Sequence, residues 1–356
     1  MKKAGIVTLY GNVNYGNRLQ NLAVQTILED HGFKVESIVF TNNHINRWKY
    51  IFRLNLKGCL KKDAEALRTL HFVRFNRKHI RIKYIYGTTQ EIPPRLLSRY
   101  DYFAVGSDQV WNIRMKEVMG KAWFYFLDFT EDKKKVCISP SIGVGLDTIP
   151  VENQVKMRRW LSGFRYLCCR EKQGAEEIAR LTGKECQWLI DPTLYVPREQ
   201  WERILSLKPS KSVPYVFLFF IDGISKELKS FIDKYAASGG FKIIDASDPS
   251  GNAYSAGPVE FVELITNAHM VFTDSFHATV FSINFHVPFY VFNRNKIRNM
   301  TSRIESISEA FSLKDRYIRE QKPFDIQETC SFEAADQQLI LERKKFSDYL
   351  DKCFEE

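Results

Sequence analysis

The sequence predicts an α/β protein built from two Rossmann-like, doubly wound domains. Short apolar runs rich in β-branched and aromatic residues alternate with segments whose apolar residues recur at helical spacing. This alternation stops at a stretch rich in Pro, Ser and Lys, residues 208–214, and then starts again. A chain of 356 residues also suits two ordinary domains better than one or three.

The first elements predict a βαβ unit. Gly5–Tyr10 is a short β-rich run, residues 11–18 form a polar loop, and a helical pattern extends to Gly32. Val35–Phe40 supplies the next strand. Because strands joined by a helical crossover run parallel, these elements predict a parallel sheet.

The later elements continue this rhythm in both halves of the chain. We therefore divide it into an N-terminal domain (1–207), a C-terminal domain (208–330) and a terminal helix (331–356). Doubly wound sheets bind ligands beyond the carboxyl ends of their strands, so two such domains in series predict a cleft between them. The remaining strands are expected at Tyr102–Val105, Val136–Ser139, Tyr166–Cys169, Cys186–Ile190, Tyr215–Ile221, Phe241–Asp245, Met270–Thr273 and Pro288–Phe292, and the clearest helices at Val151–Leu161, Lys172–Leu181 and Asp336–Phe354.

The net charge of +10 is concentrated in one segment. Residues 45–99 contain fourteen Lys or Arg and three Asp or Glu, a balance of +11, which leaves −1 for the rest of the chain. A helical pattern around Lys61–Arg77 interrupts the strand rhythm, so we expect a basic helical insertion in the first domain. Such a segment can meet phosphate, an anionic membrane surface or nucleic acid. No recognised nucleic-acid-binding motif is present, so we expect no nucleic-acid partner.

The composition excludes several other protein classes. No apolar stretch approaches the ~20 residues of a membrane-spanning helix, and polar residues break the apolar start, unlike a signal peptide. The seven cysteines show no CxxC or Cys/His ligand spacing, so we expect reduced thiols, no metal site and no disulfide framework. A cytoplasmic location is the expectation, and the oligomeric state stays open.

The first candidate site is the loop GNVNYGNR, Gly11–Arg18. A glycine-containing loop between a strand and a helix offers backbone N–H groups and the positive end of the helix dipole to an anion, and Arg18 adds a formal charge. The loop matches neither a dinucleotide fingerprint nor a P-loop. Anion or sugar binding and a plain turn with an Asn cap both fit it.

The second candidate, VGSDQVWN (Val105–Asn112), follows a predicted strand directly. An indole ring beside hydrogen-bonding side chains suits the face of a sugar. A Ser or Asp helix cap beside a core tryptophan fits the same residues. The candidate acceptor-binding residues are Ser107, Asp108, Gln109, Trp111 and Asn112.

Two further candidates follow strands of the first domain. Arg170, in the run CREK, can fork onto a carboxylate or phosphate with Glu171 orienting it, or can simply pair with Glu171 at a helix start. LIDPT (Leu189–Thr193) is a turn signal, and we interpret Asp191 as structural.

The motif that most strongly indicates a catalytic role is VFTDSFHATVFS, Val271–Ser282. A strand runs into Thr273, Asp274 and Ser275, and His277 follows at the start of an apolar helix. A histidine at a strand end, with a helix amino terminus behind it, is placed to bind an oxyanion or to transfer a proton. The other six histidines have no such setting.

Taken together, these motifs resemble the polysaccharide pyruvyl transferase family. The runs YGNVNYGNRLQN, VGSDQVWN, CREK, LIDPT and TDSFHATVFSINFHVPF match it in order and spacing over about Gly5–Phe292. The resemblance implies a two-domain arrangement similar to the GT-B glycosyltransferases, with the active site in the interdomain cleft. It also implies transfer of a pyruvyl group from phosphoenolpyruvate to two sugar hydroxyls, forming a ketal, in capsule, exopolysaccharide or cell-wall synthesis.

The resemblance also assigns roles to residues. His277 either protonates the methylene carbon of the donor or binds the departing phosphate, and His277 and Arg170 are the catalytic candidates. No nucleotide cofactor is implied. A nucleotide-sugar glycosyltransferase of GT-B type shares the architecture and is the alternative. The donor-binding candidates are Gly16, Asn17, Arg18, Arg170, Ser275 and His277.

Two places depart from the family pattern. Ala278 stands where many members have glycine after the histidine, which narrows the backbone approach to a ligand. SPSIG (Ser139–Gly143) replaces a Tyr/Ala-rich run before Ser-x-Gly, a departure that bears on the acceptor more than on the donor.

The basic segment also predicts membrane contact. Acceptors in such pathways are often lipid-linked, and apolar residues interleave with cations here as in an interfacial helix. We expect peripheral docking on the cytoplasmic leaflet, with a solvated basic insertion as the alternative. The interleaved residues are Arg47, Trp48, Lys49, Tyr50, Ile51, Phe52, Arg53 and Leu54.

Overall fold

The computed structural model describes all residues except 42–46, 88–91, 144, 209–212, 295–300 and 356, and the side chains of 47, 48, 301 and 302 also lie outside the described set. The described chain forms two compact units, each discontinuous in sequence. Unit 1 comprises Met1–Asn46, Asn76–Tyr195 and Leu341–Glu356, and unit 2 comprises Arg47–Phe75 and Val196–Ile340.

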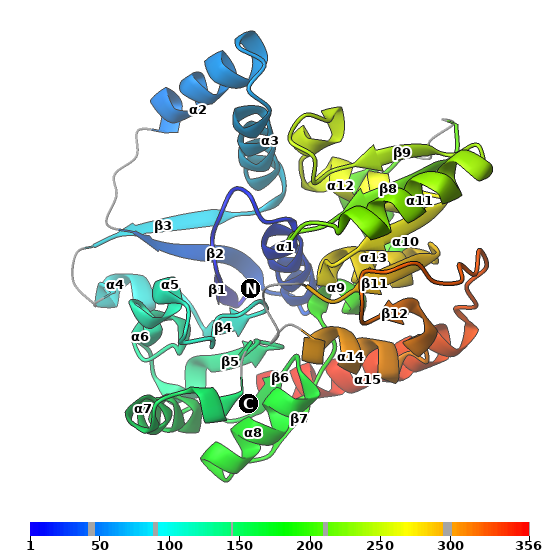
Figure 1. The fold of residues 1–356 in the computed structure, drawn as a ribbon. Helices are drawn as coiled ribbons and strands as arrows, with labels where there is room; N and C mark the ends of the chain where they lie inside the picture. The colour runs from blue at the N-terminus through cyan, green and yellow to red at the C-terminus, as the bar shows by residue number, and fades with distance from the viewer. Residues whose placement is uncertain (42–46, 88–91, 144, 209–212, 295–300, 356) are drawn as a thin grey trace. The chain divides into compact units, whose positions relative to one another are not determined.

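The helices alternate with the strands along the chain (Figure 1). They are α1 (Tyr15–Asp30), α2 (Arg47–Asn55), α3 (Ala64–His79), α4 (Pro94–Leu97), α5 (Lys116–Met119), α6 (Ala122–Tyr125), α7 (Val151–Ser162), α8 (Lys172–Thr182), α9 (Pro192–Tyr195), α10 (Arg198–Leu205), α11 (Lys226–Ser238), α12 (Pro258–Thr266), α13 (Phe276–Phe285), α14 (Thr301–Ala310) and α15 (Glu333–Phe354).

Unit 1 contains a five-stranded parallel sheet of strand order β3-β2-β1-β4-β5. The order reverses between β1 and β4, and we call the carboxyl ends of these two strands the first switch point, the place where doubly wound sheets bind ligands. Ile6 of β1 pairs with Ser37 on one side and Ala104 on the other. The strands are β1 (Lys3–Val7), β2 (Lys34–Thr41), β3 (Ile82–Tyr86), β4 (Tyr102–Gly106) and β5 (Lys135–Ile138), and a separate parallel pair, β6 (Leu167–Cys169) and β7 (Cys186–Trp188), continues beside β5.

Unit 2 contains a second five-stranded parallel sheet, of order β12-β11-β10-β8-β9. Here the order reverses between β8 and β10, whose carboxyl ends we call the second switch point. The strands are β8 (Tyr215–Phe219), β9 (Lys242–Asp245), β10 (Met270–Thr273), β11 (Phe289–Phe292) and β12 (Tyr317–Ile318).

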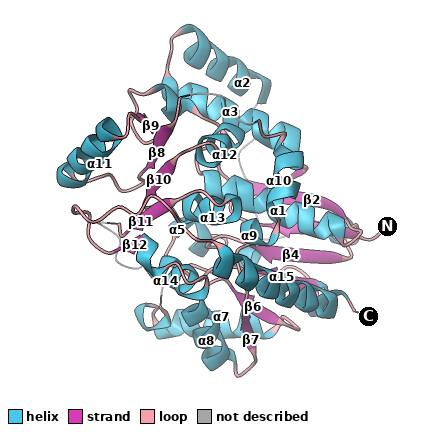
Figure 2. Ribbon diagram, turned by 90° about the vertical axis from the view of Figure 1, so that its right-hand side faces the viewer, coloured by secondary structure: helices cyan, strands magenta, loops and turns pink. Residues whose placement is uncertain are grey.

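The core of unit 2 follows the alternation of side chains along β8. Val216 and Leu218 face α11 and share a buried cluster with its residue Leu228. Phe217 and Phe219 point to the other face, where both rings contact Phe261 of α12. Figure 2 shows α11 on one side of this sheet and α12 and α13 on the other. Both faces are therefore covered, as the continuous apolar runs of its strands require.

The core of unit 1 includes a helix that is buried on every side. Each residue of α1 from Tyr15 to Leu28 is buried, although several are polar. Those polar side chains bond to the sheet and its loops: Ser37 Oγ donates to Asn21 Oδ1 at 2.9 Å, and Gln25 Nε2 donates to the carbonyl of His79 at 3.1 Å. Paired in this way, Asn21 and Gln25 fix α1 against β2 and the end of α3.

The carboxyl-terminal part of α15 packs within unit 1. Tyr349 Oη donates to the carbonyl of Cys137 in β5 at 3.0 Å, and the ring of Phe354 lies 4.7 Å from that of Phe33. The predicted amphipathic terminal helix is therefore present, and it begins three residues earlier than expected, at Glu333.

The predicted fold class, α/β with two doubly wound parallel sheets, is confirmed. The ten predicted strands are all present, and two were missed. One of them, β3, lies inside the predicted insertion, where lysine and arginine side chains obscure the apolar positions of a strand that pairs with β2. The other, β12, has only two residues.

The compact units also divide the chain differently from the predicted contiguous domains. The helical stretch Arg47–Phe75 groups with unit 2, and the change from unit 1 to unit 2 along the chain falls after Tyr195. The predicted linker, 208–214, lies largely outside the described residues. Within the described residues, no helix is both long enough and apolar enough to cross a bilayer.

Candidate functional sites

At the first switch point, α1 begins with a capped turn. Asn14 accepts a hydrogen bond from the amide of Asn17 at 3.1 Å and so caps the helix. Gly16, Asn17 and Arg18 are therefore part of the first turn of α1 rather than of an open loop, and all three are buried. Of the two interpretations of this loop, the turn with an Asn cap is observed. The cap does not use the guanidinium of Arg18, and anion binding by this residue stays a prediction.

Side chains link the two strand ends of the first switch point. Asn17 Nδ2 donates to Asp108 Oδ2 at 2.8 Å. Gln20 joins both sides, because its Nε2 donates to Thr8 Oγ1 at 2.9 Å and its Oε1 accepts from the amide of Ser107 at 2.8 Å. The loops after β1 and β4 are thus held together by polar contacts from α1.

Arg18 is the buried cation of this switch point. Its Nε donates to Asn17 Oδ1 at 2.9 Å, its Nη2 donates to the carbonyl of Leu9 at 2.6 Å, and its guanidinium lies 4.9 Å from the ring centre of Tyr10. Among the described residues, no carboxylate forms an ion pair with Arg18 and Nη1 makes no hydrogen bond. Burial lowers the pKa of Arg18 to about 10, so it stays charged at neutral pH.

Arg170 has the opposite setting. It follows β6, and its Nη1 lies 2.6 Å from Asp191 Oδ2, with both side chains almost fully buried. Asp191 Oδ1 in turn accepts from the amide of Thr193 at 2.9 Å. Burial acts to lower the pKa of Arg170, but the carboxylates of Asp191, Glu171 and Asp108 outweigh it and raise the pKa. Asp191 is thus structural, as predicted, and its partner is Arg170. The sequence did not indicate that these two residues pair.

Glu171 also has contacts that differ from those expected. Its carboxylate accepts hydrogen bonds from Ser141 Oγ and, at 3.2 Å, from Cys169 Sγ. Ser141 belongs to the run SPSIG, so this run contacts the residue next to Arg170.

Gly143, in the same run, has a φ of +65°, and an added Cβ would lie 2.4 Å from Gln109 Oε1. Glycine is required there by both backbone conformation and space.

The predicted acceptor-binding residues lie in the loop after β4, and most are already engaged within the protein. Ser107 is fully buried and donates to the carbonyl of Ser139 at 2.9 Å. Asn112 Nδ2 donates to Gln109 Oε1 at 2.7 Å. Asp108, the link to Asn17, is 9% exposed.

Trp111 corrects the sugar-face interpretation of that loop. Its side chain has no exposed surface, its ring stacks on Phe126 at 5.8 Å with a 10° interplanar angle, and its Nε1 donates to the carbonyl of Tyr125 at 3.3 Å. The core-tryptophan alternative therefore describes this residue, because a ring enclosed by protein on both faces offers no platform to a sugar.

At the second switch point, Asp274 joins the ends of β8 and β10. Its two carboxylate oxygens accept from the amides of Ile221 at 2.7 Å and Asp222 at 2.9 Å. Burial raises the pKa of Asp274, and those amides together with Arg294 offset part of the rise. Thr273 Oγ1 adds a bond to the carbonyl of Phe219. The segment before His277 is thus fixed to the neighbouring strand.

His277 is the accessible residue of an otherwise buried segment. Ser275 caps α13 by accepting from the amide of Ala278 at 3.4 Å. Every residue from Met270 to Phe285 is buried except His277, which is partly exposed in the first turn of the helix. His277 therefore lies at a helix amino terminus, as the sequence pattern predicts, where the helix dipole favours an anion, and its Nε2 atom is buried although the residue is partly exposed.

Two arginines accompany this helix start, and sequence reasoning missed both. Arg294, two residues beyond β11, donates from Nε to the carbonyl of Asp274 at 3.3 Å, and its terminal nitrogens make no hydrogen bond to the described residues. Burial lowers the pKa of Arg294, and the carboxylates of Asp274 and Asp222 offset part of this decrease. The guanidinium of Arg303, in α14, lies 5.6 Å from the ring centre of Phe276. A search for cations just after every predicted strand would have found Arg294.

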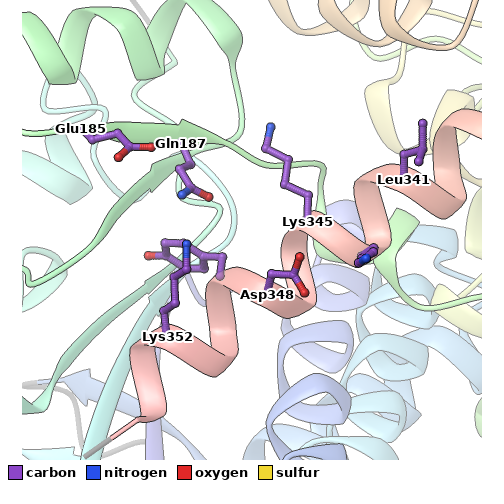
Figure 3. Close-up of a pocket in the computed structure, with 8 residues that line it drawn as sticks. Glu185, Gln187, Leu341, Lys345, Asp348 and Lys352 are labelled. Atoms are coloured by element: carbon purple, nitrogen blue, oxygen red, sulfur yellow. The ribbon is translucent and has the colours of Figure 1, made fainter.

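Other features of the surface lie apart from both switch points. A depression of about 470 Å³ lies between the β7 region and α15, and Figure 3 shows Glu185 and Gln187 on one side of it and Lys345, Asp348 and Lys352 on the other. It holds none of the candidate residues. Within the described residues, no group of three or more His, Cys, Asp or Glu side chains is arranged to hold a metal ion.

Comparison with known proteins identifies one family. The family model described as polysaccharide pyruvyl transferase matches residues 14–296, a range that begins after β1 and includes β4 and the second switch point. No curated protein matches the sequence.

Among solved structures, similar chains share little sequence with this one. A "putative UDP-N-acetylglucosamine 2-epimerase" from Listeria monocytogenes is 12% identical, with a TM-score of 0.45, and the match covers 99% of this chain and 90% of that one. An uncharacterised protein from Klebsiella pneumoniae is 13% identical, with a TM-score of 0.43 over 86% of this chain and 99% of that one. An iron-containing dodecameric glycosyltransferase, TibC, from enterotoxigenic E. coli is 10% identical, with a TM-score of 0.31 over 99% and 76%. Likenesses this distant carry no information on activity.

Proposed function

Because the chain belongs to the polysaccharide pyruvyl transferase family, we propose that it transfers the pyruvyl group of phosphoenolpyruvate to two hydroxyls of a sugar, forming a ketal. The acceptor would be a polysaccharide or a lipid-linked oligosaccharide of capsule, exopolysaccharide or cell-wall synthesis. The observation that carries the proposal is the second switch point, where a partly exposed histidine, a helix amino terminus and a mostly buried arginine occur together, the arginine's terminal nitrogens having no hydrogen bond to the described residues.

These groups match the chemistry of the donor. Phosphoenolpyruvate carries a phosphate and a carboxylate, and oxyanions bind to helix amino termini and to the planar fork of arginine. The amino terminus of α13 and the terminal nitrogens of Arg294 supply both kinds of donor. The nearby carboxylate of Asp274 does not compete strongly for Arg294, because its oxygens accept two backbone amides and its Oδ2 lies 3.9 Å from Arg294 Nε.

The reaction needs one proton transfer to carbon and two new C–O bonds. A proton adds to the methylene carbon of the donor, a sugar hydroxyl attacks the adjacent carbon, and its proton is released. The C–O bond to phosphate then breaks, and the second hydroxyl attacks the same carbon and gives up its proton. One of the two hydroxyl protons balances the proton now on carbon, and the other leaves with inorganic phosphate. His277 is either the acid of the first step or a ligand of the leaving phosphate.

Among the remaining donor-binding candidates, Gly16, Asn17, Arg18 and Ser275 keep their predicted role in the proposal, whereas Arg170 is given a positioning role in place of its predicted catalytic one. Arg18 makes no hydrogen bond from Nη1 to the described residues, so this nitrogen can donate to an anion. Arg170 is buried against Asp191, so its effect on the reaction would be to hold the segment after β6 in place. No cofactor is required by this chemistry.

Donor-induced thermal stabilisation tests the proposal. A ligand that binds only the folded state raises Tm by mass action, so phosphoenolpyruvate should raise it and a panel of nucleotide sugars should not. Arg294→Gln should abolish the shift, whereas Arg319→Gln, which removes an exposed arginine of the same unit, should keep it. A shift with a nucleotide sugar alone would contradict the proposal and favour glycosyl transfer.

Affinity and turnover together then separate the two roles of His277. If His277→Gln abolishes phosphate release but keeps the phosphoenolpyruvate-induced shift, the histidine acts as the acid. If the shift is lost as well, the histidine binds phosphate.

A further inference from the structure

The hairpin formed by α2 and α3 exposes a face that is both apolar and basic. After α2 the chain continues as a π-helical turn, Leu56–Leu60, before α3 begins. Phe52, Leu56 and Leu60 are 68%, 39% and 75% exposed, although such large apolar side chains are ordinarily buried. Their spacing of four residues places them along one side of the helix. We call these three the exposed stripe.

The packing of the hairpin explains why this stripe faces outward. Leu54 and Gly58, on the opposite side of the same helix, are buried against α3. A Cβ on Gly58 would come within 2.9 Å of the Cα of Leu67, so the two helices touch at this glycine. The inner face is therefore fixed by close packing, and the exposed stripe cannot turn inward without breaking that contact.

The hairpin is in turn anchored to unit 2. His71 Nδ1 lies within hydrogen-bonding distance of the carbonyl of Ser255, at 2.8 Å, and the guanidinium of Arg68 lies 5.0 Å from the ring centre of Tyr254. The exposed stripe thus belongs to a structured element rather than to a loose tail.

Cations surround the stripe, and acids are absent from it. Residues 47–62 contain six Lys or Arg and no Asp or Glu. Arg53, Lys57 and Lys61 each follow a stripe residue directly and are exposed. The pattern is that of an interfacial helix, with apolar side chains at one level and long cationic side chains beside them.

We infer that this face docks on an anionic phospholipid bilayer, with Phe52, Leu56 and Leu60 entering the headgroup boundary and the flanking lysines and arginine contacting lipid phosphates. Charge complementarity selects this occupant, because an acidic surface satisfies the cations while its hydrocarbon takes up the apolar stripe. A polar polyanion such as nucleic acid would leave the stripe in water. The inference is independent of the donor and of the transfer reaction.

Vesicle cosedimentation tests it with the full chain alone. Wild-type protein should bind vesicles of phosphatidylcholine with about one third phosphatidylglycerol at least tenfold more tightly than pure phosphatidylcholine vesicles. The preference should shrink as salt is raised, because headgroup charge is screened. Phe52→Gln/Leu60→Gln should weaken binding about tenfold, since glutamine keeps helix propensity but removes the apolar surface.

The matched control is Val151→Gln/Val155→Gln in α7, which removes two similarly exposed apolar side chains at helical spacing from unit 1. It should leave vesicle binding unchanged. Equal loss in both double variants would overturn the inference, as would equal binding to neutral and anionic vesicles. A concentration-dependent dimer that Phe52→Gln/Leu60→Gln abolishes, without vesicle binding, would assign the stripe to a second copy of the chain and also overturn it.

A label at Cys59 supplies a second readout should the double variant fold poorly. Cys59 is the exposed cysteine among the seven and lies next to Leu60. An environment-sensitive fluorophore on Cys59 should shift to the blue on adding anionic vesicles, and the same labelling of Cys59→Ser should give no such change. A labelled wild type that stays unshifted while it cosediments would place the contact elsewhere and contradict the inference.

Discussion

The two switch points differ in how they use their arginines. Beside the first, Arg170 contacts Ser107 and forms an ion pair with Asp191 through Nη1, and Arg18 has no hydrogen bond from Nη1 to the described residues. At the second, Arg294 contacts Asp274 through Nε, and its terminal nitrogens make no hydrogen bond to the part of the chain that the structure describes. An arginine paired with a buried carboxylate is costly to remove because its partner would be left as an unpaired buried charge, whereas one without partners at its terminal nitrogens can take an anionic ligand. The same residue type is thus paired internally in unit 1 and, in our proposal, binds the donor in unit 2.

The switch points also differ in what they expose. After β4, the polar side chains bond to one another and Trp111 fills the core. After β10, a buried helix presents a single accessible side chain, His277. Chemistry needs a group that substrate can reach, so the comparison favours unit 2 for the reactive residue that we propose.

The largest expected effect is on turnover. His277→Gln should lower phosphate release from phosphoenolpyruvate by about 10²- to 10⁴-fold, the usual contribution of a positioned acid or base, while Tm changes little because the side chain is partly exposed. The control is His286→Asn at the other end of α13, where asparagine tolerates the φ of +57°. Unchanged phosphate release in His277→Gln would remove the central difference between the switch points.

The next effect is on stability. Arg170→Ala leaves the fully buried Asp191 without its partner, which should cost about 3–5 kcal/mol and lower Tm in thermal unfolding. Replacing both partners by apolar residues, Arg170→Met/Asp191→Leu, should recover most of that loss. If Arg170→Ala keeps its Tm but loses donor binding, Arg170 is a ligand-binding residue and the contrast with Arg294 fails.

A smaller effect is expected on donor affinity at the first switch point. Arg18→Lys keeps the charge but removes the planar fork, so the affinity for phosphoenolpyruvate should fall about tenfold, as measured by calorimetric titration. Arg294→Lys is the parallel change at the second switch point. A loss seen only in Arg294→Lys would take Arg18 out of the donor-binding set.

The smallest effect concerns pH. The pKa of Asp274 is raised above its unfolded value, chiefly by burial, so its contribution to stability is full below about pH 4 and is lost as pH rises through the raised pKa. The Tm of the wild type should therefore fall relative to that of Asp274→Asn as pH rises from about 4 toward neutrality. A difference that is constant over this range would mean that the carboxylate is not destabilised by its burial.

Much of the fold followed from local patterns. Each apolar run that predicted a strand is a strand, because parallel strands buried on both faces must be continuously apolar and are bounded by polar loops. β3 escaped notice because it is a short, partly exposed edge strand, Ile82–Tyr86, that contains one lysine and lies in a strongly basic segment. The assignment of Arg47–Phe75 to unit 2 depends on contacts such as His71 with Ser255, separated by 184 residues, which no local pattern carries.

The sequence by itself determined the two parallel sheets, the order of their elements and the place of His277 at a helix start, because these depend on periodicity and on which residues follow a strand. Only the tertiary structure decided which charged and aromatic side chains are available to a ligand. Trp111 and Arg170 look as accessible in the sequence as His277 does, yet packing encloses the first and an aspartate 21 residues away pairs with the second. Availability depends on burial and on partners distant in sequence, and those are properties of the folded chain.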